Sequence, residues 1–530
     1  MPPKEAILLG DEAVALAAVH AGITSAYAYP GTPATEIMEF LHPLAKKKGT
    51  FKATWAVNEK TAYEEALGCS LAGGRTIVSM KHVGLNVAAD PFMNSAMVEI
   101  HGGFVVASAD DPGMHSSQNE QDSRYYADFA LAPAFEPAHQ QEAYDMTCAA
   151  FDLSEKFHLP VMMRLVTRLA HSRSKVMTRE PKGKNAVSKA PDPTHTWNLL
   201  PANARKQYLR LLGKHAELEK LSDTSPFNTL ELNSKRTGVI TNGIALNYYR
   251  EALAHLKEKP SHLHIGFYPL PKELINKLFD HCDQIVVIEE GMPFIERKLT
   301  GIIPLSKPVH GKLDGCVPST GELNPRIVLT TLDGKSPKGL ESPMPLPTRP
   351  PQLCQGCPHA DTYGVIKEII QEVQGTLVTS DIGCYTLGAL PPYNAIETCV
   401  CMGASITMAK GAADAGYRPV IATIGDSTFM HSGITGLIDA IEDNADMTLF
   451  ILDNAGVAMT GGQPSKGTGD RLVTLVKGLG VDPAHLRVVE AHPKQKEANI
   501  KIVREEVAYK GLSVIIARRE CLEMAKKHKK

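Results

Sequence analysis

The sequence has little charge imbalance, no long apolar run and few cysteines, and each scarcity excludes a class of protein. Its 530 residues carry 56 lysines and arginines against 58 aspartates and glutamates, which favours neither nucleic acid nor an anionic membrane as a partner. No segment reaches the roughly 18 consecutive apolar residues of a membrane helix, and the N-terminal apolar stretch, cut by Asp11 and Glu12, lacks a signal-peptide cleavage pattern. Ten cysteines are too sparse for a disulfide scaffold. We therefore expect a cytoplasmic protein whose cysteines are buried thiols or metal ligands.

Short apolar runs alternate with helical patterns in three segments, which predicts parallel β-sheets with crossover helices and a multidomain α/β fold. The chain is too long for one core, and its length suggests roughly three or four domains. Proline-rich and polar stretches separate the segments, because prolines interrupt both helix and sheet. The expected parts are an α/β domain at 1–180, a linker with one helix at 181–235, a second α/β domain at 236–335, a Pro-rich connector at 336–351, a third α/β domain at 352–521 and a basic, solvated tail at 522–530.

Two apolar strands that each end in polar side chains provide the clearest functional signal, within residues 423–463. Gly425, Asp426 and Ser427 follow the first strand, and Asn454 follows the second. Ligands of parallel sheets bind at this carboxyl edge, and carboxylate and amide oxygens suit Mg²⁺. The glycine allows close backbone approach, and the helix after Ser427 can point its N-terminus at phosphates. A capping Asp would explain Gly-Asp-Ser alone, but the paired strands favour a magnesium and thiamine diphosphate site.

A Cys-x-x-Cys pair, Cys354 and Cys357, lies in a loop opened by prolines. Such a pair is a zinc half-site, a redox pair or half of an iron–sulfur site. Thioredoxin-like use is disfavoured, because the pair is not expected to end a strand and start a helix in a βαβ pattern. Cys399 and Cys401 lie at an apolar helix start and are expected to pack in the interior. The remaining cysteines show no ligand spacing: Cys69, Cys148, Cys282 and Cys316.

Several stretches resemble the thiamine diphosphate-dependent 2-oxoacid:ferredoxin oxidoreductases, most closely their indolepyruvate branch. They are YPGTPATE, VNEKTA, MKHVGLNVAADP, SADDPGMHSSQNEQDSRYYA, LCQGCPHAD, SDIGCYTLG and VCMGAS, and the similarity covers nearly the whole chain. The resemblance implies two thiamine-binding parallel-sheet domains, one pyrimidine-type and one diphosphate-type, plus a transketolase C-terminal-like α/β domain.

The same resemblance assigns roles to individual residues. Glu59 matches the Glu that hydrogen-bonds the aminopyrimidine of the cofactor, whereas Glu64 and Glu65 fit the solvent face of the same helix better. Thr32 matches the Thr that contacts the substrate. The resemblance also implies cofactor contacts at Gly383, Met402 and Gly403, beside Gly425 and Ser427, and a third magnesium ligand from the carbonyl of Gly456.

The group that binds the substrate carboxylate is left unassigned. Relatives place an Arg where this chain has Asp110-Asp111-Pro112-Gly113, a departure shared with the indolepyruvate branch. Nearby candidates, each set against simple loop packing, are His115, Ser116, Gln118 and Arg124; His115 is the one that we include among the expected catalytic residues.

The resemblance also implies an iron–sulfur cluster. In ferredoxin-coupled relatives a Cys-x-x-Cys pair, a Cys in an Ile-Gly-Cys loop and a Cys after the last strand hold four irons, and these positions correspond to Cys354, Cys357, Cys384 and Cys521. Four thiolates suit a 4Fe-4S cluster, which the reaction needs because two electrons must leave singly. No tandem cysteine runs of a ferredoxin-like domain precede Lys530. We therefore expect electrons to leave through another subunit or carrier, or the oxidative half-reaction not to run.

The leading hypothesis is oxidative decarboxylation of an aryl-2-oxoacid, of the indolepyruvate or phenylpyruvate type, to an aryl-acetyl-CoA. The runner-up is a non-oxidative thiamine-dependent decarboxylase or lyase. A catalytically silent partner-binding subunit is a third hypothesis, disfavoured by the presence of Glu59, Asp426 and Asn454 together. The resemblance further implies a smaller beta subunit that helps to hold coenzyme A, an external acceptor such as ferredoxin, and an α2β2 assembly.

Overall fold

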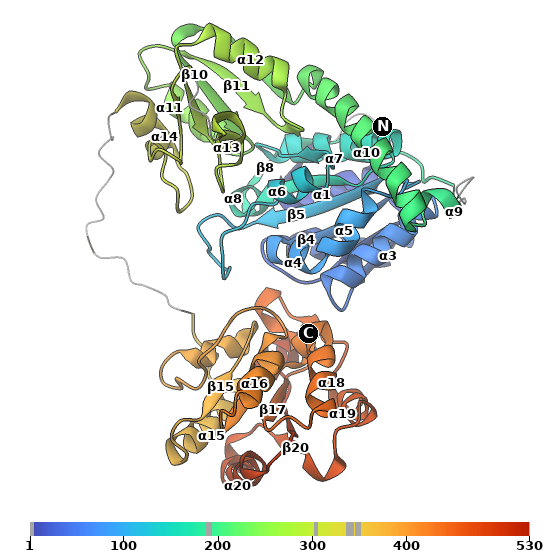
Figure 1. The fold of residues 1–530 in the computed structure, drawn as a ribbon, viewed down its shortest axis with the longest axis vertical. Helices are drawn as coiled ribbons and strands as arrows, with labels where there is room; N and C mark the ends of the chain where they lie inside the picture. The colour runs from blue at the N-terminus through green and yellow to red at the C-terminus, as the bar shows by residue number, and fades with distance from the viewer. Residues whose placement is uncertain (1–4, 187–192, 302–305, 335–343, 345–350, 529–530) are drawn as a thin grey trace. The chain divides into compact units, whose positions relative to one another are not determined.

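The computed structural model describes residues 5–186, 193–301, 306–334, 344 and 351–528. The chain divides into two compact units, Met1–Glu341 and Ser342–Lys530 (Figure 1). One seven-stranded and two five-stranded sheets carry the fold, which confirms the predicted multidomain α/β class. Within the described residues, no helix combines the length and the apolar character needed to cross a membrane.

The first sheet is mainly parallel and buried on both faces. Its strand order is β12-β6-β7-β5-β4-β2-β3. All residues of β4, β5 and β7 are buried, as expected for a parallel sheet covered by helices such as α3 (Glu59–Leu71) and α7 (Gln140–Phe157). The strands are β2 (Ser25–Ala28), β3 (Lys52–Trp55), β4 (Thr76–Lys81), β5 (Phe104–Asp110), β6 (Ala134–Phe135), β7 (Val161–Val166) and β12 (Phe267–Tyr268). A separate two-stranded sheet pairs β1 (Glu5–Leu9) with β8 (Arg173–Met177).

The second sheet lies in the same unit as the first. Its order is β14-β13-β10-β11-β9, and α10 (Pro201–Thr224) confirms the helix expected in the linker. Strand β12 pairs with β6 of the first sheet, so these segments form one unit where the sequence suggested three separate parts. The strands are β9 (Asn228–Glu231), β10 (Ser234–Asn242), β11 (Pro260–Ile265), β13 (Gln284–Ile288) and β14 (Val309–His310), and the neighbouring helices are α11 (Ala245–Leu253), α12 (Lys272–His281), α13 (Phe294–Thr300) and α14 (Pro325–Asp333).

A buried ionic network links the two sheets of this unit. Arg164 donates from Nε to Asp110 at 2.7 Å and also pairs with Glu136. Arg124 donates from Nη1 to Glu289, at the end of β13, at 2.9 Å. All five side chains are buried. Burial removes the water that would solvate each of these charges, so each one is stabilised by the opposite charge beside it.

We expect Arg164→Leu to lower the free energy of unfolding by about 3–5 kcal/mol, because the substitution leaves the buried Asp110 and Glu136 without their counter-ion. Chemical denaturation of the purified chain measures this change. Arg179→Leu is the matched control, since Arg179 is exposed and its pair with Asp145 contributes about 1 kcal/mol or less. Equal stability of the two variants would contradict the structural role of the network.

The second unit contains one parallel sheet in the order β15-β16-β17-β21-β20. Strands β16 and β17 are the two apolar strands predicted around the magnesium motif, and both are buried throughout. The strands are β15 (Leu377–Thr379), β16 (Val420–Gly425), β17 (Thr448–Asp453), β20 (Leu486–Glu490) and β21 (Ser513–Arg518), with helices α15 (Pro358–Glu372), α16 (Ala404–Asp414), α18 (Ile434–Glu442), α19 (Gly469–Gly478) and α20 (Lys496–Ala508).

The predicted basic tail at 522–530 begins with a helix. Residues Leu522–His528 form α21, in which Lys526 is exposed. Met524 is buried, and its sulfur lies 3.0 Å from the position that a Cβ on Gly456 would take. Met524 therefore packs α21 against the loop that contains Gly456, although the lysines of this segment suggested a free end. The predicted connector at 336–351 lies outside the described residues, apart from Met344 and Pro351.

Candidate active site

Four neighbouring strands of the first unit bring predicted site residues to one sheet edge. Strands β5, β4, β2 and β3 lie side by side and run parallel. Thr32 follows β2 and is half-buried, Glu59 follows β3, and the loop at 111–117 follows β5. The carboxyl edge of such a sheet is where ligands bind. The structure therefore brings Thr32, Glu59 and the His115 loop to one edge of the sheet.

Glu59 is the first residue of α3. Asn58 caps this helix, its side chain accepting a hydrogen bond from the Thr61 amide at 2.8 Å. Glu59 is 5% exposed, whereas Glu64 and Glu65 are exposed, which agrees with the sequence-based distinction. A Cβ at Gly84, in α4 (His82–Val87), would lie 2.5 Å from Glu59 Oε1. The glycine thus allows the backbone of α4 to pass directly over the carboxylate.

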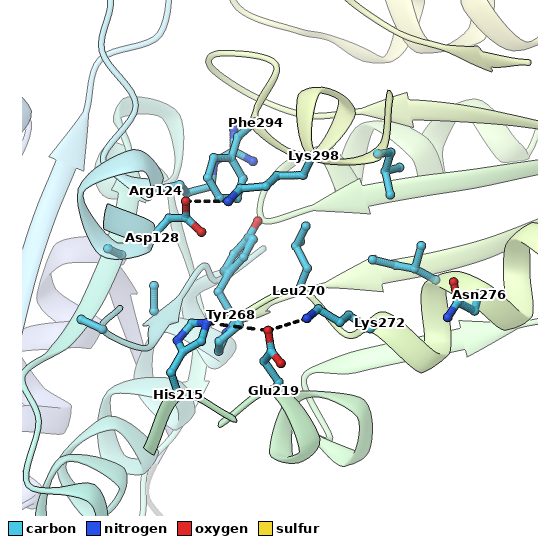
Figure 2. A pocket seen from close by; sticks show the side chains of 16 residues that line it. Arg124, Asp128, His215, Glu219, Tyr268, Leu270, Lys272, Asn276, Phe294 and Lys298 are labelled. Carbon is cyan, nitrogen blue, oxygen red and sulfur yellow. Dashed lines mark hydrogen bonds and ion pairs between the residues drawn. The ribbon is translucent and has the colours of Figure 1, made fainter. Parts of the chain in front are cut away.

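Two of the carboxylate-binding candidates are already paired with acids. His115 is exposed, and its Nε2 lies 3.1 Å from Oε2 of Glu322. Arg124 belongs to the buried network, and its guanidinium stacks 5.2 Å from the ring centroid of Phe294. Arg124 and Phe294 line a pocket of about 430 Å³ (Figure 2). Two ion pairs also line that pocket: Lys298 with Asp128 at 2.6 Å and Lys272 with Glu219 at 2.6 Å.

The second unit has a corresponding edge. Its strands β15, β16, β17 and β21 are consecutive neighbours in one parallel sheet. Cys384, Asp426, Asn454 and Cys521 follow these four strands in that order. The predicted magnesium ligands therefore lie on the two central strands, and two of the predicted cluster cysteines lie on the strands that flank them.

Asp426 is a buried carboxylate with spare acceptor capacity. Its Oδ1 accepts the Ser427 amide at 2.7 Å, while Oδ2 has no hydrogen-bond partner among the described residues. Burial, together with the nearby Asp453 carboxylate, holds the pKa of Asp426 well above its ordinary value. An unpaired buried carboxylate is costly unless a cation neutralises it. The site therefore fits a divalent ion.

Asn454 is held by two partners that orient its amide. Its Nδ2 lies 3.0 Å from Nε2 of His359, and its Oδ1 accepts the Gly456 amide at 3.3 Å. Burial lowers the pKa of His359 to about 4, so the neutral ring accepts from Asn454 Nδ2. This assignment turns the amide oxygen of Asn454 toward the Gly456 loop. His359 was missed in the sequence, although it directly follows the Cys-x-x-Cys-Pro stretch.

The glycines near the predicted diphosphate site are required by close packing. Tyr385 packs against both Gly383 and Gly425, where a Cβ would lie 2.3 Å and 2.6 Å from the ring. Gly403 has a φ of 90° and precedes α16. Asp381 accepts hydrogen bonds from the Gly403 amide at 3.1 Å and from Ser405 Oγ at 2.7 Å. Sequence reasoning missed Asp381, although it is an acid just after a strand, as Asp426 is.

The helix that follows Asp426 is interrupted. Residues Asp426–Thr428 are α-helical, Phe429–Gly433 form a π-turn, and α18 continues from Ile434. Such π-turns inside helices occur frequently at functional sites. Ser427 and Met402, the other predicted cofactor contacts, are both half-buried.

The four predicted cluster cysteines line one small cavity. Cys354, Cys357, Cys384 and Cys521 surround a space of about 100 Å³, to which Asn454 also contributes. The Cys521 amide donates to the Asn454 carbonyl at 3.0 Å, so the loop of Cys521 is tied to the loop of Asn454, a predicted magnesium ligand. Burial, with the other three cysteines adding to it, raises the pKa of Cys384 to about 12. Mutual proximity of the four sulfurs explains this added effect.

One expectation about cysteines holds and another needs correction. Cys357 is the N-cap of α15, but residues 351–354 before it have no regular structure, so the Cys-x-x-Cys pair does not end a strand, as expected. Cys399 and Cys401 are exposed and not packed. The reason is that α16 begins only at Ala404, so both cysteines lie in the preceding loop and never reach a helix face.

Comparisons with known proteins agree with this geometry. Residues 16–208 match the family described as "Pyruvate flavodoxin/ferredoxin oxidoreductase, thiamine diP-bdg", and residues 381–517 match "Thiamine pyrophosphate enzyme, C-terminal TPP binding domain". The indolepyruvate oxidoreductase subunit IorA of Archaeoglobus fulgidus is 38% identical, over 98% of this chain and 86% of that protein. The chain belongs to the IorA family. The IorA of Methanothermobacter marburgensis is 36% identical over 97% of this chain and 86% of its own length.

Among solved structures, 2-oxoglutarate:ferredoxin oxidoreductase from Magnetococcus marinus has a TM-score of 0.52 at 18% identity. That match covers 62% of this chain and 65% of the other, slightly less than two thirds of its length. At this identity the likeness shows the fold alone. Membership of the IorA family, with the two matched regions, identifies the chain as one subunit of a thiamine diphosphate-dependent 2-oxoacid oxidoreductase.

Proposed function

We propose that this subunit oxidatively decarboxylates an aryl-2-oxoacid, of the indolepyruvate or phenylpyruvate type, to an aryl-acetyl-CoA. It does so with thiamine diphosphate, Mg²⁺ and one 4Fe-4S cluster. One observation carries the proposal: the cavity formed by four cysteines includes Asn454, a predicted magnesium ligand. An electron-accepting centre at that cavity would adjoin the cofactor site, as an oxidative reaction requires.

The residues of the chain have distinct roles in this proposal. Asp426, Asn454 and the Gly456 carbonyl hold the magnesium ion, which takes oxygen ligands. Thiamine diphosphate, when bound, supplies the carbon nucleophile and the electron sink for decarboxylation. Glu59, kept from water at the start of α3, holds and returns a proton at the aminopyrimidine. Thr32 donates its hydroxyl to the substrate.

His115 keeps its proposed catalytic role. Its ring is exposed on the loop that follows β5, and its Nε2 lies 3.1 Å from Oε2 of Glu322.

The reaction favours a cluster over zinc at the four cysteines. Four thiolates hold zinc readily, and they equally suit a 4Fe-4S cluster. Zinc has no redox chemistry, so it cannot accept electrons from the substrate. Oxidative decarboxylation therefore favours the cluster at this cavity.

The proposed partners follow from the family. The IorA relatives are themselves named as subunits of an indolepyruvate oxidoreductase, which implies an enzyme of several chains. We assign the coenzyme A site in part to a smaller beta subunit in an α2β2 assembly. Ferredoxin or another external carrier would take the electrons.

The function is tested with the assembled enzyme prepared without oxygen. We expect indolepyruvate or phenylpyruvate to reduce a viologen dye in a coenzyme A-dependent reaction that yields the aryl-acetyl-CoA. An enzyme that releases carbon dioxide and the aryl aldehyde without reducing the dye would be a non-oxidative decarboxylase, and the proposal would be wrong.

We expect Asp426→Ala and Asn454→Ala to weaken thiamine diphosphate binding by at least about tenfold, because each removes an oxygen from the ion that neutralises the diphosphate. Titration calorimetry at several magnesium concentrations measures this loss, and added magnesium should restore part of the affinity. Asp439→Ala, which removes an exposed acid from α18, is the control. Unchanged affinity in both site variants would contradict the magnesium assignment.

A further inference from the structure

Lys81 is a buried lysine at the carboxyl end of β4, between the two loops expected to meet the substrate. It ends β4 and is 8% exposed. On the β2 side, a Cβ at Gly31 would lie 3.1 Å from Lys81 Cβ, so the loop carrying Thr32 packs on the lysine stem. On the β5 side, the Lys81 ammonium donates to the Ser116 carbonyl at 2.7 Å.

The ammonium of Lys81 has unused donor capacity. It carries three N–H donors, and its described partners are both on Ser116, the carbonyl at 2.7 Å and the hydroxyl at 3.5 Å. No carboxylate among the described residues lies within ion-pair distance of it. Asp111 is the acid whose charge acts on it, but the Asp111 oxygens already accept hydrogen bonds from the Ser116 amide, Ser117 and Thr167.

The residue after Lys81, His82, also has polar atoms without hydrogen-bond partners in the described part of the chain. His82 is 1% exposed, and neither of its ring nitrogens has a hydrogen-bond partner among the described residues. Buried polar groups in folded proteins are nearly always satisfied. Two consecutive residues at the end of β4, Lys81 and His82, therefore have hydrogen-bonding capacity that a polar ligand at this edge would fill.

The other cations near this edge are committed to protein acids. Arg124 and Arg164 belong to the buried network, and His115 pairs with Glu322. His171 lies 3.3 Å from the carboxylate of Glu36. Among the described cations considered at this edge, Lys81 is thus the one without an acidic partner in contact.

We propose that the Lys81 ammonium binds the carboxylate of the 2-oxoacid substrate. This inference rests on the proposed function and supplies the cation that the Asp110-Asp111-Pro112-Gly113 stretch lacks. The Ser116 carbonyl orients the amine, and the remaining N–H groups face the ligand. A lysine binds a carboxylate as a point charge, without the two-pronged geometry of arginine.

The test compares a charged ligand with its neutral analogue. 3-Phenyllactate has the aryl group and carboxylate but no keto carbon, and its amide lacks the charge. In the assembled enzyme, we expect Lys81→Met to raise the inhibition constant of 3-phenyllactate by about ten- to hundredfold, the effect of losing a charge-assisted hydrogen bond. The inhibition constant of the amide should stay unchanged. For phenylpyruvate, KM should rise by a similar factor while kcat changes little.

Two further variants separate charge from folding. Lys81→Arg keeps the positive charge and should recover most of the discrimination between acid and amide. Lys312→Met removes another buried lysine, whose amine donates to the Gly291 carbonyl, and should leave the acid-to-amide ratio as in the wild type. If Lys81→Met keeps the wild-type ratio, or lowers affinity for both ligands equally, Lys81 does not bind the carboxylate. If the wild type itself binds no arylpyruvate, the proposed function fails instead.

Discussion

Glu59→Gln is expected to lower turnover by on the order of a hundred- to ten-thousandfold while thiamine diphosphate remains bound. Glutamine keeps the shape of the side chain beneath Gly84, but it cannot hold and return a proton. The diphosphate is anchored by other residues, so binding and catalysis should separate. Steady-state rates of dye reduction, together with cofactor titration by calorimetry, measure the two effects on the same preparation.

The matched control for this variant lies on the same helix. Glu64→Gln changes an exposed carboxylate of α3 and should leave both turnover and cofactor affinity near wild-type values. If Glu59→Gln retains more than about a tenth of wild-type activity, well short of a typical acid–base loss, Glu59 is not the group that acts on the aminopyrimidine.

Most of the cofactor site was predictable because polar residues directly after apolar strands are visible in a sequence. Asp426 and Asn454 follow β16 and β17 at adjacent positions of one parallel sheet. Cys384 and Cys521, which follow the two flanking strands, line one cavity with Asn454. A polar residue after each strand is enough to predict this grouping, since neighbouring parallel strands end at one edge of the sheet.

Other features depend on contacts between distant segments and were not predictable. Arg124 looked like a loop cation, but it pairs with Glu289, which follows a strand of another sheet and lies 165 residues away in the sequence. The sequence analysis did not single out Lys81, because its packing against Gly31 joins two separate loops and is visible only in the structure. In helix α21, Met524 packs against Gly456. The lysine-rich composition of this segment does not predict that contact.

Loss of the proposed 4Fe-4S cluster is the other effect that we expect to be large. We expect the protein, isolated without oxygen, to contain about four irons and four sulfides per chain at the cysteine cavity. Cys384→Ala should lose this iron and with it the reduction of the dye, because a cluster that lacks one of its four thiolate ligands is no longer held. Chemical iron and sulfide analysis, with the visible absorption spectrum, measures the loss. Cys399→Ala, an exposed cysteine of the same unit, should keep the full content.

The outcome also separates the two metals that four cysteines bind well. Zinc has no redox chemistry, so a chain with stoichiometric zinc at these cysteines could decarboxylate a 2-oxoacid but could not pass electrons from it. The placement of the cavity argues against this result, because Asn454, a proposed magnesium ligand, lines it together with the four cysteines. The Cys521 amide, which donates to the Asn454 carbonyl, adds a direct link between the two proposed sites. A redox centre benefits from such closeness to the cofactor, whereas a purely structural zinc has no need of it.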